Sequence, residues 1–113
     1  MELTVETEIL PEGIALILLH GEADVHTCPR VKQAIGELLD RGSLQLVVNL
    51  EGLEFLDSTA LGVLIGSLRR ARDRNGDLKL VCENPRILRI LEVAGVKRLF
   101  AIYPSTAAAL AGR

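Results

Sequence analysis

The sequence has few of the residues that mark secreted, membrane-spanning or metal-bound proteins. It holds two cysteines, three aromatic residues and no tryptophan among 113 residues. Its longest apolar run, residues 14–19, has six residues, whereas a membrane-spanning helix needs about 20. The first six residues are alternating and acidic, unlike a secretory signal. We therefore expect a cytoplasmic protein in which Cys28 and Cys82 are free thiols.

The net charge of the chain is small. Lys and Arg number 13 against 15 Asp and Glu, a formal net charge of −2. This balance argues against direct electrostatic binding of nucleic acid or of an anionic membrane. Apolar residues make up 49% of the chain, which excludes a disordered protein. We expect residues 1–113 to form one domain.

The hydrophobic pattern predicts an α/β fold. Alternating or continuous apolar positions predict five strands, and apolar residues three and four apart predict four helices. The strands are expected over residues 3–9, 14–20, 44–50, 78–82 and 99–102, and the helices over residues 28–41, 58–74, 85–94 and 104–111. The order ββαβαβαβα implies a mixed, mostly parallel central sheet flanked by helices, with an antiparallel first strand.

Three details of this pattern can be checked against the structure. Residues 53–56 are expected to be a connector rather than a strand. Thr27 is placed to cap the first helix. In the third helix, the residues expected to face the core are Ile87, Leu88, Leu91 and Val93.

Chemistry concentrates in the segment Leu56-Asp57-Ser58-Thr59-Ala60-Leu61-Gly62, where a connector becomes a helix. An Asp or Ser at a helix start is ordinarily a cap that contributes about 1 kcal/mol. A hydroxyl there is also well placed to carry a phosphate, because the free N–H groups and the helix dipole favour negative charge.

Thr59, Gly62 and Gly66 lie three and four residues apart on the same helix, away from most of its leucines. Each glycine inside a helix costs about 0.8–1 kcal/mol relative to alanine. Two explanations remain open for these glycines. A neighbouring helix of the same domain packs closely against them, or a partner protein does.

Other chemistries have weaker support. A serine hydrolase would need a Gly-x-Ser-x-Gly elbow and a downstream histidine, but both histidines precede Ser58. His20, His26 and Cys28 match no zinc spacing, so no metal is expected. Cys28 could have a lowered thiol pKa in a first helical turn. No glycine-rich phosphate loop is present, so no cofactor is expected. The arginines between residues 69 and 74 read as a solvated helix face.

Asp57-Ser58-Thr59-Ala60-Leu61-Gly62-Val63-Leu64, after the strand Leu46-Val47-Val48-Asn49-Leu50, resembles the signature of STAS domains. The closest resemblance is to single-domain bacterial anti-sigma factor antagonists. Gly21-Glu22-Ala23-Asp24-Val25 resembles a second motif of that family, at the right distance. One departure is Ala60, where many members have glycine; its methyl is expected beside the phosphoacceptor.

The resemblance implies a role for each matching residue. Ser58, rather than Thr59, corresponds to the serine phosphorylated by a partner anti-sigma factor, itself a serine kinase. Asp57 and Asp24 correspond to acids on the same surface. Together with Thr59, Gly62 and Gly66, they would bind the partner while Ser58 is unphosphorylated. A PP2C-type phosphatase would reverse the modification. The oligomeric state is left open.

Two alternatives stay beside this interpretation. The chain could be a STAS scaffold or the soluble subunit of a signalling or transport complex, or, from another class, a small hydrolase using Ser58. For the partner switch, we expect phosphate to act by steric and electrostatic block rather than by refolding, because a helix start tolerates the charge. All of this requires the Ser58 hydroxyl to be exposed.

Overall fold

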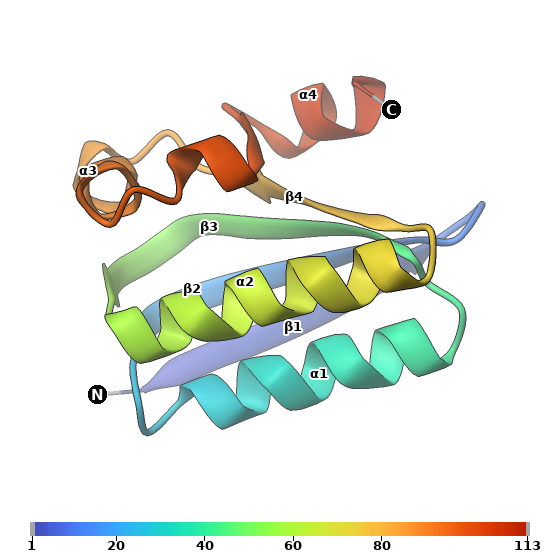
Figure 1. Ribbon diagram of the computed structural model, residues 1–113, viewed down its shortest axis with the longest axis horizontal. Helices are drawn as coiled ribbons and strands as arrows, with labels where there is room; N and C mark the ends of the chain where they lie inside the picture. The colour runs from blue at the N-terminus through green and yellow to red at the C-terminus, as the bar shows by residue number, and fades with distance from the viewer. Residues whose placement is uncertain (1, 113) are drawn as a thin grey trace.

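Five strands form one sheet whose spatial order follows the sequence, β1-β2-β3-β4-β5. The computed structural model describes residues 2–112. β1 pairs antiparallel with β2, and the remaining neighbours pair in parallel, which confirms the mixed, mostly parallel sheet (Figure 1). The strands are β1 (Leu3–Leu10), β2 (Ile14–Ala23), β3 (Gln45–Leu56), β4 (Asp77–Val81) and β5 (Ala101–Tyr103).

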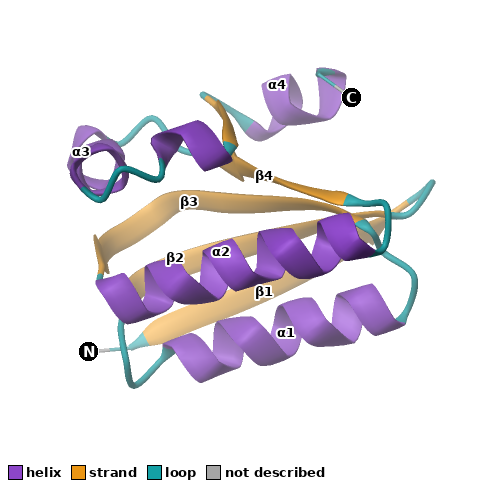
Figure 2. Cartoon of the chain, in the orientation of Figure 1, coloured by secondary structure: helices purple, strands orange, loops and turns teal. Residues whose placement is uncertain are grey.

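Within residues 2–112, four α-helices and one short 3₁₀ helix flank the sheet. They are α1 (Cys28–Asp40), α2 (Ser58–Asp73), α3 (Pro85–Val93), η1 (Lys97–Leu99) and α4 (Thr106–Ala111). The order ββαβαβαβα is confirmed. α1 and α2 cover one side of the sheet and α4 lies on the other (Figures 1 and 2). Within residues 2–112, no helix has the length and apolarity needed to cross a bilayer.

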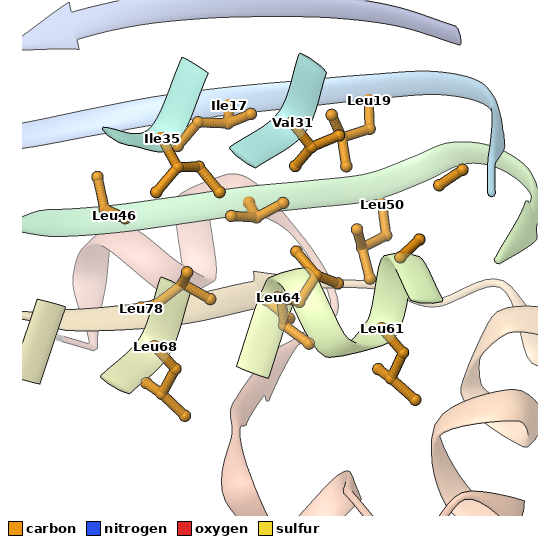
Figure 3. Packing of buried hydrophobic residues seen from close by; sticks show 14 of the residues in the cluster. Ile17, Leu19, Val31, Ile35, Leu46, Leu50, Leu61, Leu64, Leu68 and Leu78 are labelled. Carbon is orange, nitrogen blue, oxygen red and sulfur yellow. The ribbon is translucent and has the colours of Figure 1, made fainter. Parts of the chain in front are cut away.

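The main core lies between the sheet and the helices α1 and α2 (Figure 3). Leucines and other aliphatic residues three and four apart give each helix one buried stripe, and the facing strands supply the opposite layer. The labelled side chains are Val31 and Ile35 of α1, Leu61, Leu64 and Leu68 of α2, and Ile17, Leu19, Leu46, Leu50 and Leu78 of the strands. A smaller cluster around Ala109 anchors α4 on the other face.

The central strands are longer than the sequence predicts. Residues 53–56, expected as a connector, are the last part of β3, and β2 continues past His20 to Ala23. The two strands stay paired through register shifts between Leu18 and His20 and between Gly21 and Glu22. Such bulges bend a strand without ending its pairing. As a result, both strands deliver their following loops to the same end of the sheet.

Two further expectations were wrong in detail. Val93 does not face the core: the residue is 76% exposed, whereas Ile87 and Leu91 are fully buried. The strand expected over residues 99–102 begins at Ala101, because residues 97–99 form the η1 turn. The exposed Val93 lines a hollow that is described with the functional site.

Gly21 lies so close to the backbone of Glu2 that no side chain would fit between them. Gly21 and Gly42 both have positive φ, 106° and 89°, a region that costs an L-residue about 1–2 kcal/mol. A methyl group on Gly21 would also collide with the carbonyl oxygen of Glu2, whereas a methyl on Gly42 would meet no atom within 4 Å.

We therefore predict that Gly21→Ala loses more stability than its matched control Gly42→Ala. Overpacking adds about 1–3 kcal/mol to the strain that both variants share. Urea unfolding should separate the two free energies of unfolding by at least about 1 kcal/mol. Equal losses would contradict the close approach of Glu2 to Gly21.

Candidate functional site

Ser58 and Thr59 are exposed in the first turn of α2, as the sequence interpretation required. Asp57 is the N-cap of this helix, and its Oδ1 accepts a hydrogen bond from the Ala60 N–H at 2.8 Å. The cap therefore does not use the Ser58 hydroxyl. Within residues 2–112, that hydroxyl has no hydrogen-bond partner, so it is free to be modified or to contact another molecule.

Asp57 also holds the preceding loop in place. Its second oxygen, Oδ2, accepts a hydrogen bond from the Val25 N–H at 2.9 Å, and its own N–H donates to the Ala23 carbonyl at 3.0 Å. The loop after β2 is thereby tied to the start of α2, and Figure 2 shows both at the same end of the sheet. The two motifs singled out in the sequence thus form one surface.

Asp24 organises this loop from within. Its Oδ1 accepts hydrogen bonds from the His26 N–H at 2.8 Å and from the Thr27 N–H at 3.0 Å. These bonds, the one from the Thr27 N–H most strongly, lower the pKa of the Asp24 carboxyl. Thr27 stands at the N-cap position of α1 but makes no side-chain capping bond to the helix, contrary to expectation. Its hydroxyl instead donates to the Glu22 carbonyl at 2.9 Å.

Two neighbouring residues differ from expectation. Burial raises the pKa of the Cys28 thiol, with Asp57 and Asp24 adding to the effect, so the expected lowering was wrong. Ala60 is 3% exposed and points into the core; its methyl does not lie on the outer surface beside Ser58. Among residues 2–112, no group of three or more His, Cys, Asp or Glu side chains could hold a metal ion.

The glycines of α2 form the floor of an open groove. A methyl group built on Gly62 or Gly66 would meet no atom of a neighbouring segment within 4 Å. Close packing of a second helix of the domain is therefore the wrong explanation for them. Thr59 and both glycines line a hollow of about 410 Å³ between α2 and α1, whose side walls are Lys32 and Arg70.

A second hollow begins at Ser58 itself and was missed by the sequence interpretation. It has a volume of about 450 Å³ and lies between the start of α2 and the outer face of α3. Its lining is mainly apolar, with two arginines, and comprises Ser58, Leu61, Arg86, Arg89, Ile90, Val93 and Ala94. A signal existed in the sequence: residues 86, 89, 90 and 93 repeat at helical spacing. The sequence pattern was interpreted with Val93 in the core, and this assignment hid the exposed face of α3.

The arginines at the end of α2 behave as a structural set. Arg72 pairs with Asp77 at 3.3 Å and Arg74 with Asp40 at 3.2 Å. Arg70 lies against Gly36 of α1, and Arg69 is exposed. Two of these charges are thus used to join α2 to its neighbours, at the end of the helix away from Ser58.

Comparison with known proteins places these features in one family. The model of the STAS domain matches residues 6–109. The chain is 31% identical to an anti-sigma F factor antagonist of Paenibacillus polymyxa, over 97% of this chain and 94% of that protein. It is 29% identical to an anti-sigma-B factor antagonist of Staphylococcus aureus, over 94% and 97%. The crystal structure of an anti-sigma factor antagonist from Mycobacterium paratuberculosis superposes with a TM-score of 0.89 at 27% identity, covering 98% and 93% of the two chains.

The double role of Asp57 gives a stability prediction. Asp57→Ala should lower the free energy of unfolding by about 1–3 kcal/mol, because it removes both the cap and the bond to Val25. Asp57→Asn keeps an oxygen at the cap and should lose less. Ser105→Ala removes only the bond to the Ala108 N–H at the start of α4 and serves as the control. If Asp57→Ala cost no more than Ser105→Ala in urea unfolding, the double role would be wrong.

The open groove predicts that replacing its glycines with alanine stabilises the protein, in contrast to the loss expected for Asp57→Ala. Gly62→Ala and Gly66→Ala should each stabilise the isolated protein by up to about 1 kcal/mol, since alanine favours the helix and the methyl has room. Gly36→Ala is the matched control, because its methyl would lie 2.8 Å from an Arg70 guanidinium nitrogen, and it should gain less. Destabilisation by the first two substitutions, measured by thermal unfolding, would show that the groove is filled in solution.

Proposed function

The chain belongs to the STAS domain family, and on that premise we propose that it is an anti-sigma factor antagonist switched by phosphorylation of Ser58. Unphosphorylated, it binds an anti-sigma factor that is also a serine kinase, and this binding releases the sigma factor. Phosphorylation by that kinase ends the complex. A PP2C-type phosphatase restores the binding form. The exposed, unpartnered Ser58 hydroxyl at the start of α2 is the observation on which the proposal rests.

The position of Ser58 supports modification without refolding. Among the described residues 2–112, its hydroxyl makes no hydrogen bond that a phosphate would break, and the helix cap is the side chain of Asp57. Phosphate adds roughly −1.5 to −2 charges, and the free N–H groups at a helix start favour them. The domain therefore accommodates the added charge in the conformation it already has.

A docked partner would not accommodate it. The docking face in our proposal comprises the start of α2, the loop at Asp24 and the glycine groove formed by Thr59, Gly62 and Gly66. A partner packed there would bury the phosphate beside the carboxylate of Asp57. Burying such a charge without compensating cations costs several kcal/mol. Docking and phosphorylation thus exclude each other at one side chain.

Catalysis in this scheme belongs to the partners, and the chain itself is a substrate and binding module acting in the cytoplasm. The hydrolase alternative would need a base at Ser58. Within residues 2–112 neither histidine bonds to its hydroxyl: His20 lies 3.7 Å from Glu6, and His26 belongs to the exposed loop.

The test is a pull-down from the native host with Ser58→Ala and Ser58→Asp proteins. We expect the alanine form to capture an ATP-binding serine kinase and the aspartate form to lose at least about 90% of it, as a penalty above 1.4 kcal/mol implies. The captured kinase should phosphorylate wild-type protein and the control Ser105→Ala, whose substitution lies at the start of α4 outside the docking face, but not Ser58→Ala.

Two other results would overturn the proposal. Recovery of transporter subunits by both variants would favour the scaffold alternative. Ester hydrolysis by the wild-type protein that disappears in Ser58→Ala would favour the enzyme.

A further inference from the structure

Arg86 and Arg89 of α3 line the same hollow as Ser58 of α2. Both arginines line that hollow together with Ser58, and both are exposed. Within residues 2–112 neither forms an ion pair, unlike Arg72 and Arg74 at the other end of α2. Two cations without an ion pair in residues 2–112 therefore line the same hollow as the side chain that the proposed function phosphorylates.

The fold fixes the direction in which α3 presents them. Asn84 caps α3 by accepting a hydrogen bond from the Arg86 N–H at 2.9 Å, and its side-chain amide donates to the Leu53 carbonyl at 3.2 Å. Ile87 and Leu91 are fully buried on the inner face of the helix. The helix is thus held at its cap and along its inner face, which leaves residues of its outer side in the lining of the hollow.

Arg86 occupies an unfavourable place in the isolated domain. It lies in the first turn of α3, which contains no acidic residue. The positive end of the helix dipole is at that turn and repels a cation. An anion bound beside Arg86 would offset this repulsion. Within residues 2–112, no carboxylate forms an ion pair with Arg86 there.

We propose that the phosphate on Ser58 is bound in cis by Arg86 and Arg89, and that the two arginines close the hollow over its apolar lining. This inference rests on the proposed function. Guanidinium groups bind phosphate oxygens by paired, charge-assisted hydrogen bonds. Arginine stems are apolar and cover hydrophobic surface when their heads are held, here the surface of Leu61, Ile90 and Val93.

We call this pairing of Arg86 and Arg89 with the Ser58 phosphate the latch. It would give the phosphorylation switch a second component. Before phosphorylation, the hollow offers a partner an apolar floor and two free arginines that suit acidic side chains. After phosphorylation, the arginines are paired within the domain and the floor is covered. The modification therefore withdraws attractive surface in addition to placing a bulky group at the centre of the docking face.

The latch can be tested on the protein alone, with phosphoserine incorporated genetically at position 58. Cations beside the phosphate favour its dianion and so lower its second pKa. We expect ³¹P NMR titration to give a second pKa at least about 0.5 units lower in the wild-type phosphoprotein than in Arg86→Gln/Arg89→Gln. The other charged groups nearby, Asp57, Asp24 and His26, are present in both proteins.

Arg41→Gln/Arg69→Gln is the matched control, since it removes the same charge from exposed positions at the far ends of α1 and α2. Its phosphate should titrate like that of the wild type. Equal pKa values in the wild type and Arg86→Gln/Arg89→Gln, or an equal rise in the control, would overturn the latch. No partner takes part in the titration, so its failure would leave the pull-down result standing, and the reverse also holds.

Discussion

The site depends on the two oxygens of one carboxylate, that of Asp57. One oxygen caps α2 through the Ala60 N–H and the other holds the Val25 N–H of the loop after β2. This bridge adds to the bond from the Asp57 N–H to the Ala23 carbonyl and joins the first turn of α2 to the loop at Asp24. With it, they form one surface, and the cap is filled by a residue other than Ser58. In the part of the chain that the structure describes, the Ser58 hydroxyl has no hydrogen-bond partner, because Asp57 forms the capping bond in its place.

Helix α2 divides its faces between stability and recognition. Leu61, Leu64 and Leu68 bury one face against the sheet, whereas Gly62 and Gly66 leave the other open. The glycines reduce helix stability by about 0.8–1 kcal/mol each, and nothing within the described part of the chain fills the space they leave. Such a loss is understandable if a partner's backbone comes close. The departure at Ala60 has no bearing on that surface, because its side chain belongs to the core.

The fold was largely predictable because each element carries its own periodic signal. The ends of the strands were less predictable. β2 and β3 continue through register shifts, and bulges leave no clear trace in an alternating sequence pattern. Ser58, Asp57 and the glycines could be chosen from a local motif. The hollow beside α3 could not, because it depends on how α3 stands against α2. The raised pKa of Cys28 likewise results from burial and from Asp57, which lies 29 positions further along the sequence.

The central claim is that the state of one exposed hydroxyl decides whether a partner docks. Isothermal titration of the captured kinase with unphosphorylated and Ser58-phosphorylated protein tests it most directly. A penalty of several kcal/mol for a buried phosphate predicts at least about 100-fold weaker binding of the phosphorylated form. Equal affinities for the two forms would contradict the account, whatever else the site contains.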